Sequence, residues 1–310
     1  MKRMSTLDAA WLAVESDDTP MHVANLQIFS LPEDAPDTFL RDLVARMKSG
    51  RDFAPPWNHR LVNSGKVGRT LTPAWKIDND LDLDYHVRHS ALPKPGGERE
   101  LGVLISRLHS HPLDFNRPLW ESHIIEGLEH NRFALYTKMH HSLIDGISGV
   151  RLLRRVLSTN PGARNMPPPW TVRPERVKLI GGAPANPAHG LEAALDALRQ
   201  QLKTVPKLAG ALGKLVRHEP GSTLVGPFAG PASVLNRRVT PQRRFATQQY
   251  GLSELRELAN QADASLNDIV LYLCGTALRR FLKEQNALPS EPLTAGIPVN
   301  IRPADDQGTG

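Results

Sequence analysis

Residues 134–150 of this 310-residue chain read ALYTKMHHSLIDGISGV. The stretch before them, from Arg132 to Lys138, alternates apolar and polar side chains, which predicts a half-buried strand. The stretch after them, from Ile147 to Leu157, carries apolar residues at helical spacing. His140 and His141 therefore lie where a strand turns into a helix, and we expect the fold to be organised around this turn.

The two histidines cannot share one role, because adjacent residues of a strand point to opposite sides of the sheet. Neutral imidazole removes a proton from a hydroxyl group near neutral pH when its other nitrogen has a partner that fixes the tautomer. Two histidines hydrogen-bonded to backbone carbonyls at a turn are the simpler interpretation, and it stays open at this point. A zinc site is disfavoured, because adjacent histidines splay apart, unlike the i, i+4 pairs of helical metal sites.

The composition, 40% hydrophobic and 23% charged, is typical of a soluble globular protein. No run approaches the roughly 20 apolar residues that cross a bilayer, and no apolar signal-peptide core is present. These features predict a cytoplasmic protein, with attachment to a membrane surface left open. The single cysteine, Cys274, excludes an intramolecular disulfide, and its apolar surroundings predict a small buried core residue.

The formal net charge of +6 favours anionic partners, such as nucleic acid or acidic lipid head groups. Aromatic residues make up only 5% of the chain and do not alternate with the basic pairs. A stacking platform for single-stranded nucleic acid is therefore disfavoured. We expect no nucleic-acid partner.

The order of predicted elements is that of a mixed α/β protein. We expect helices at 6–14, at 37–48 and from 98, and strands at 21–29, 120–126 and 132–138. A first domain is assigned to residues 1–160, a linker rich in proline and glycine to 161–240, and the start of a second domain to 241–310. Within the linker, residues 191–216 have the pattern of a basic amphipathic helix, which binds a membrane surface or packs between domains. In the last part we expect strands at 244–250 and 293–301 and helices at 252–261 and from 265.

Several motifs along the chain point to one family. The sequence HHSLIDG, from His140 to Gly146, matches the HHxxxDG motif of the CoA-dependent acyltransferase superfamily. The opening MSTLDAAW of residues 4–11, the PLW of Pro118, Leu119 and Trp120, the pair Asn267 and Asp268, and PVNIRP of residues 298–303 accompany it. Together they resemble the bacterial wax ester synthase/diacylglycerol acyltransferase family from the first residues to the last.

The resemblance implies a chloramphenicol acetyltransferase-like α/β fold of two similar domains with mixed sheets. Because the family's two-domain core needs roughly one and a half times this length, we expect an N-terminal domain plus the beginning of the second. A further C-terminal portion or a second polypeptide would then complete the fold.

The resemblance also implies the roles of the motif residues. His141 is expected to be the general base that takes the hydroxyl proton of a long-chain alcohol or diacylglycerol, which then attacks acyl-CoA without a covalent acyl-enzyme. His140 orients the motif or lines the acceptor side. Asp145, followed by Gly146, is expected to form an ion pair with Arg302 of the Asn300-Ile301-Arg302 segment, whose bidentate guanidinium would lock the turn. Pro118, Leu119 and Trp120 are expected to support the cavity, and Asn267 and Asp268 to cap a helix within their own motif.

Two alternatives remain beside this interpretation. A condensation-type acyltransferase shares HHxxxDG but takes its acyl group from a carrier protein, and the LDAAW opening and the PLW segment argue against it. A catalytically idle lipid-binding scaffold of the same fold is the other. In either case we expect no metal and no covalently bound cofactor, and a location in the cytoplasm, at the inner face of a membrane or on lipid inclusions.

Overall fold

The structure, a computed structural model, describes residues 2–4, 6–71, 73–144, 146–160, 162–163, 165–172 and 230–295. They divide into two compact units. The first holds the described residues up to 172 together with Val239–Gln249, and the second holds residues 230–238 and 250–295. The expected amphipathic helix at 191–216 and most of the expected strand at 293–301 lie outside the described residues.

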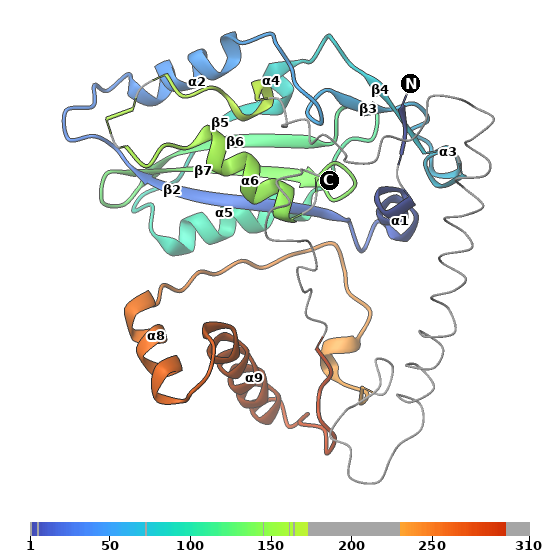
Figure 1. The fold of residues 1–310 in the computed structure, drawn as a ribbon, viewed down its shortest axis with the longest axis vertical. Helices are drawn as coiled ribbons and strands as arrows, with labels where there is room; N and C mark the ends of the chain where they lie inside the picture. The colour runs from blue at the N-terminus through green and yellow to red at the C-terminus, as the bar shows by residue number, and fades with distance from the viewer. Residues whose placement is uncertain are drawn as a thin grey trace. The chain divides into compact units, whose positions relative to one another are not determined.

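A four-stranded mixed sheet in the order β2-β7-β6-β5 carries the first unit (Figure 1). Its strands are β2 (His22–Ser30), β7 (Arg132–His140), β6 (Trp120–Leu128) and β5 (Val87–Ala91). β5 and β6 are parallel, and the other pairs are antiparallel. Three residues, 129–131, connect β6 to β7, and two of them, His130 and Asn131, have positive φ of 61° and 53°. This hairpin fixes the register of the strand that ends in His140.

Helices cover both faces of this sheet (Figure 1). On one face lies α5 (Glu98–Ser110), whose Leu101, Leu104 and Ile105 pack against strand residues such as Ile125. Their spacing of three and four residues gives the helix one apolar side. On the other face lie α2 (Phe39–Ser49) and α6 (Gly146–Val156), which share a larger core cluster. The helices predicted from periodicity at these positions are confirmed.

Short elements close the end of the sheet near the histidines. A second sheet has the order β1-β4-β3. Its strands are β1 (Lys2–Arg3), β4 (Ala74–Ile77) and β3 (His59–Leu61). Of the remaining short helices, α1 (Thr6–Val14) contacts α3 (Lys66–Leu71), α4 (Leu83–His86) contacts β5 and β6, and the 3-10 helix η1 (Pro169–Thr171) contacts α6. The helix expected at 6–14 is thus confirmed as α1.

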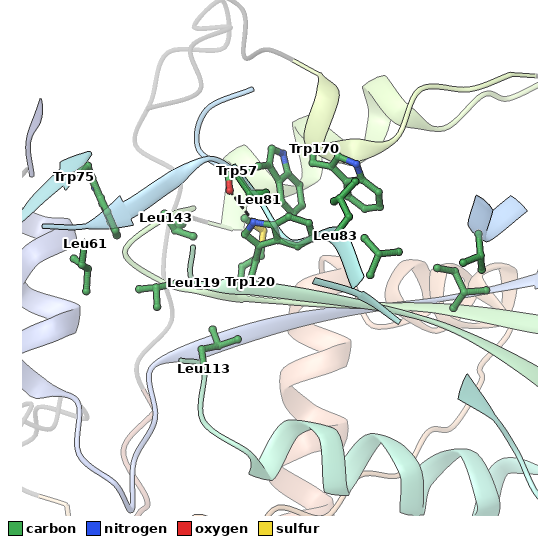
Figure 2. Packing of buried hydrophobic residues seen from close by; sticks show 14 of the residues in the cluster. Trp57, Leu61, Trp75, Leu81, Leu83, Leu113, Leu119, Trp120, Leu143 and Trp170 are labelled. Carbon is green, nitrogen blue, oxygen red and sulfur yellow. Dashed lines mark hydrogen bonds between the residues drawn. The ribbon is translucent and has the colours of Figure 1, made fainter. Parts of the chain in front are cut away.

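Three tryptophans form the centre of the larger core (Figure 2). The Trp120 ring stacks on Trp170 at 5.3 Å and meets the Trp57 ring edge-on at 4.9 Å. Nε1 of Trp120 donates a hydrogen bond to the Trp57 carbonyl oxygen at 2.7 Å, which satisfies the indole N–H away from water. Trp170 belongs to the segment expected to be a linker, yet it is fully buried, so residues 165–172 help to hold the first unit together.

The second unit contains the 3-10 helix η2 (Val234–Asn236), α8 (Leu252–Gln261) and α9 (Leu266–Glu284). Both α-helices were expected. Cys274 in α9 is exposed, so the prediction of a buried core cysteine is wrong.

The strand expected at 244–250 is also wrong. Within the first unit, this segment runs extended along α5 without pairing to a described strand (Figure 1). The backbone N–H of Arg243 donates to Oγ of Ser110 at 2.8 Å, and the Thr247 hydroxyl donates to the Glu98 carboxylate. An extended segment becomes a strand of a sheet only where another strand supplies the backbone hydrogen bonds.

Candidate active site

The end of β7 presents His140 and His141 in two different environments. His140 is 1% exposed, and its Nε2 lies 2.5 Å from a carboxylate oxygen of Glu15, itself buried. The backbone N–H of Ser142 donates to Nδ1 of His140 at 3.1 Å. Because Nδ1 accepts that hydrogen bond, the proton of the neutral ring is on Nε2, and it is donated to Glu15. Both ring nitrogens of His140 are therefore committed within the protein.

His141 is only partly buried. Its backbone N–H donates to the Met21 carbonyl oxygen at 2.8 Å, which ties the turn to the start of β2. The imidazole stacks on the indole of Trp11 in α1, with ring centroids 4.0 Å apart and planes 18° apart. Nδ1 of His141 is buried and has no hydrogen-bond partner among the described residues. Among the described residues, Nε2 of His141 has no hydrogen-bond partner either, so neither nitrogen of this ring is committed within that part of the protein.

Trp11 and Glu15 approach the histidine pair from the same element. They are four residues apart, at the last turn of α1 and just beyond it, so they lie on one side of the helix. Trp11 contacts His141, and Glu15 contacts His140. Neither role was predicted. The spacing was visible in the sequence, but these contacts join residues more than a hundred positions apart.

The PLW segment lies directly beside the turn. Pro118 and Leu119 precede β6, and the backbone N–H of His140 donates to the Leu119 carbonyl oxygen at 2.9 Å. Leu119 and Trp120 are fully buried, and Trp120 also stacks on His86 at 4.4 Å. Nδ1 of His86 hydrogen-bonds the Trp120 carbonyl oxygen at 2.7 Å, and burial lowers the His86 pKa to about 4. This neutral, buried support fixes the backbone that holds His140.

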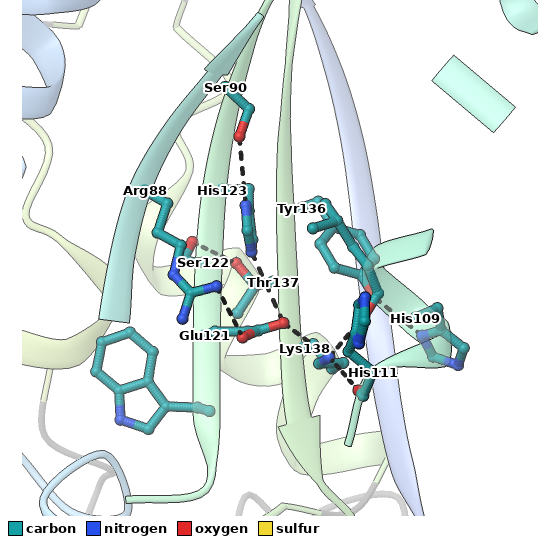
Figure 3. Close-up of polar contacts among 12 residues, drawn as sticks. Arg88, Ser90, His109, His111, Glu121, Ser122, His123, Tyr136, Thr137 and Lys138 are labelled. Carbon is teal, nitrogen blue, oxygen red and sulfur yellow. Dashed lines mark hydrogen bonds and ion pairs between the residues drawn. The ribbon is translucent and has the colours of Figure 1, made fainter. Parts of the chain in front are cut away.

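A buried ion pair lies on the α5 face of the sheet, where Lys138 is two residues before His140 on β7 (Figure 3). Nζ of Lys138 lies 2.7 Å from a Glu121 oxygen, 2.7 Å from the Leu108 carbonyl oxygen and 2.8 Å from that of His111. Its three N–H donors thus have three acceptors. Lys138 is fully buried, so an unpaired ammonium there would be costly. The pair joins the two central strands to the end of α5.

The charges of this pair follow from competing effects. Burial alone would raise the pKa of Glu121, but His123 and the Lys138 ammonium outweigh it and hold that pKa at about 2. At 3.7 Å, Nε2 of His123 is too distant for a hydrogen bond to Glu121, so the ammonium at 2.7 Å is the closer partner. Burial lowers the pKa of Lys138, and the charge of Glu121 opposes that shift. We describe the pair as ionised.

His22 completes the attachment of α5. It is the cross-strand neighbour of His140 on β2, and its Nε2 donates to the His109 carbonyl oxygen at 2.8 Å. Burial, followed by the charge of Lys138, lowers the pKa of His22 to about 4, so the ring is neutral near pH 7. Carbonyl oxygens at a helix end have no partner within the helix. Here β2 and β7 supply donors to three of them, which locks α5 to the strands that carry the turn.

The other predicted site residues are distributed as follows. Asp145, Asn300 and Arg302 lie outside the described residues, so their expected ion pair is not described. Gly146 begins α6 immediately after the turn. Asn267 and Asp268 lie in the first turn of α9, in the second unit.

Asp268 caps its helix. Its carboxylate accepts hydrogen bonds from the backbone N–H of Ser265 at 2.9 Å and from the Ser265 hydroxyl at 2.6 Å. These hydrogen bonds hold the pKa of Asp268 below its ordinary value. This reciprocal arrangement is a capping box, in which Asp268 satisfies a free amide at the helix start.

Among the described residues, no three histidine, cysteine or acidic side chains come together as metal ligands. In the same part of the chain, none of the helices is both long and apolar enough to span a bilayer. The site contains a partly buried histidine, an aromatic ring on its face and a buried carboxylate behind its neighbour. Imidazole in such a setting is a group suited to proton transfer.

A matching family model and two matching relatives are described as acyltransferases. A family model described as wax ester synthase/diacylglycerol acyltransferase catalytic domain matches residues 4–270. The O-acyltransferase WSD of Acinetobacter baylyi is 38% identical over 309 residues, covering 98% of this chain and 65% of that protein. The probable diacylglycerol O-acyltransferase tgs2 of Mycobacterium tuberculosis is 40% identical over 314 residues, covering 100% and 66%.

A solved structure gives the same relationship in three dimensions. The wax ester synthase/diacylglycerol acyltransferase from Marinobacter aquaeolei VT8 is 36% identical to this chain, with a TM-score of 0.73 over 96% of this chain and 65% of that protein. The expected two-domain acyltransferase fold class is thereby confirmed. The chain spans about two thirds of the length of these relatives.

Proposed function

This chain belongs to the wax ester synthase/diacylglycerol acyltransferase family, and from that premise we propose that it transfers a long-chain acyl group from acyl-CoA to an alcohol. The acceptor is a fatty alcohol, which gives a wax ester, or a diacylglycerol, which gives a triacylglycerol. The names of the matching family and of its solved relative include both activities.

The observation that carries the proposal is the unequal use of the two histidines. His140 has both ring nitrogens in hydrogen bonds within the protein, to Glu15 and Ser142. Nδ1 of His141 is buried without a partner among the described residues, and we assign Nε2 as the nitrogen that faces the acceptor hydroxyl. A general base must lie within hydrogen-bond reach of the proton that it removes, and of the pair only His141 has ring nitrogens that no described residue occupies.

The reaction then proceeds in two steps. Nε2 of His141 takes the proton of the acceptor hydroxyl while its oxygen attacks the thioester carbonyl carbon, giving a tetrahedral oxyanion. The oxyanion collapses, the carbon–sulfur bond breaks, and coenzyme A leaves as a thiolate that recovers the proton from His141. No acyl-enzyme forms. Ser142, the nearest hydroxyl, lies 2.6 Å from Nδ1 of His140 and supports the turn.

Residues that touch His140 act on the base through the backbone. Glu15 fixes the ring of His140, and Leu119 accepts the hydrogen bond of its backbone N–H. The peptide that follows His140 presents His141. We also propose, from the family motif, that Asp145 forms an ion pair with Arg302 beside Asn300 and so holds the same turn.

The substrates also indicate where the protein acts. Long-chain alcohols and diacylglycerols reside in membranes and lipid inclusions, and a net charge of +6 favours an anionic surface. We therefore propose peripheral association with the cytoplasmic face of a membrane or with lipid inclusions.

Product formation tests the proposal directly. Radiolabelled palmitoyl-CoA is incubated with the protein and hexadecanol or dioleoylglycerol, and the lipids are separated. Labelled wax ester or triacylglycerol that depends on the matching acceptor is expected. Product from a palmitoyl carrier protein but not from palmitoyl-CoA would favour the condensation-type alternative. No product from any donor would favour an idle lipid-binding scaffold.

A further inference from the structure

Trp11 is placed to act on the same reaction. Its indole covers one face of the His141 imidazole at 4.0 Å and almost parallel. The contact is not part of the main hydrophobic core, because both side chains are only partly buried. The four other tryptophans pack in that core, so Trp11 differs from them in position as well as in partner.

A stacked aromatic ring does two things to an imidazole. The stacked ring restricts rotation of the imidazole, so that Nε2 keeps one direction. The negative face of the stacked ring also attracts a cation, and tryptophan does so more strongly than phenylalanine or tyrosine. In the proposed reaction, His141 is neutral before proton transfer and carries a positive charge in the tetrahedral intermediate. An interaction that is stronger with the charged ring lowers the barrier rather than merely tightening substrate binding.

We infer that Trp11 is a positioning residue of the active site, which holds the His141 ring and stabilises the imidazolium formed when His141 accepts the acceptor's proton. The inference rests on the proposed acyl transfer. It assigns to the start of the chain a role in the reaction and not only in packing. It also requires an aromatic side chain at position 11, whereas packing alone would be satisfied by an aliphatic residue.

The expected change in kcat follows from the energy of cation–π contacts. Cation–π contacts contribute about 0.5–2 kcal/mol, which converts to about a two- to thirty-fold change in rate. Trp11→Leu is therefore expected to lower kcat by that factor and to leave KM for palmitoyl-CoA unchanged, because the contact is with the base and not with the donor. Trp11→Phe keeps an aromatic face and is expected to stay closer to the wild type.

The experiment measures kcat and KM of wild type, Trp11→Phe and Trp11→Leu with palmitoyl-CoA and hexadecanol. Thermal unfolding of each variant shows whether it is folded. In parallel, histidine-labelled protein is studied by NMR, with the His141 ring resonance assigned through His141→Gln. Ring-current shielding by the indole is expected to move this resonance upfield in wild type, to persist in Trp11→Phe and to disappear in Trp11→Leu.

The outcomes separate the two proposals. A loss of kcat in Trp11→Leu, rescued in Trp11→Phe and accompanied by the loss of shielding, supports the inference. Equal kcat in the two variants, a change confined to KM, or a His141 resonance that does not respond to Trp11→Leu overturns it while the proposed function stands. A wild type that transfers no acyl group overturns the proposed function and this role with it.

Discussion

Replacing Lys138 by methionine removes the ammonium that neutralises Glu121 in the interior of the first unit. Methionine has a similar length and no charge, so the change leaves the volume nearly filled. The Glu121 side chain, 8% exposed, then remains as a buried carboxylate with the Arg88 guanidinium 3.6 Å away. The carbonyl oxygens of Leu108 and His111 also lose their donor.

Two estimates give the scale of the free energy of unfolding that is lost in Lys138→Met. The pKa of Glu121, about 2 instead of 4.5, corresponds to about 3 kcal/mol for the combined effect of burial, His123 and Lys138, so it sets the scale of the loss and is not the share of Lys138 alone. Breaking a buried ion pair by removing one partner costs about 3–5 kcal/mol. Arg88 compensates part of the charge, so we expect Lys138→Met to lower the free energy of unfolding by about 3 kcal/mol.

The assay is urea unfolding followed by circular dichroism, with the single variants and the pair Lys138→Met and Glu121→Leu in a double-mutant cycle. Because the double variant has no unpaired charge, it should be more stable than Lys138→Met alone, although it carries one more substitution. Arg154→Met, an exposed site in α6, serves as the control for loss of a cation. A double variant at least as unstable as Lys138→Met, or a loss below about 1 kcal/mol in Lys138→Met, would refute the reasoning.

Three further predictions concern the same unit. Glu15→Ala leaves the buried N–H of His140 without an acceptor, so thermal unfolding should show a loss of about 1–3 kcal/mol, with less loss in Glu15→Gln. His22 and His86 have folded-state pKa values of about 4, below their ordinary 6.5, so the unfolded chain binds more protons between these pH values and stability falls as the pH falls. Urea unfolding should give a free energy of unfolding about 2 kcal/mol lower per histidine at pH 5 than at pH 7.5. Equal urea midpoints at the two pH values would contradict this. Gly96→Ala should cost more than about 2 kcal/mol in the same assay, because φ is +81° and the added Cβ would lie 1.8 Å from the Gly127 carbonyl oxygen.

Periodicity located the elements of the first unit because each buries one side. The alternation of β7 and the three-and-four spacing of α5 are direct consequences of a sheet covered by a helix. The strand expected at residues 244–250 was wrong, because the extended segment there has no described strand beside it. The prediction for Cys274 was also wrong, because an apolar helix is buried only where another element covers it.

The candidate site was predictable in part for a different reason. His140 and His141 carry a motif, and their adjacency at a strand end already implied two different roles. Glu15 was not predictable, because its contact with His140 spans 125 residues and depends on where α1 ends. The ion pair of Lys138 with Glu121 depends on the register of the hairpin, which the sequence pattern does not specify to one residue.

The role of His141 as the general base is best tested by thiol release from palmitoyl-CoA in the presence of hexadecanol or dioleoylglycerol. The release is compared among wild type, His141→Gln and His140→Gln. Circular dichroism and thermal unfolding of each variant accompany the assay. We expect His141→Gln to be folded as stably as wild type and to have lost acceptor-dependent release. We expect His140→Gln to be less stable and to retain part of the release. Full activity in His141→Gln, or a stable His140→Gln that alone is inactive, would contradict the assignment of His141 as the base.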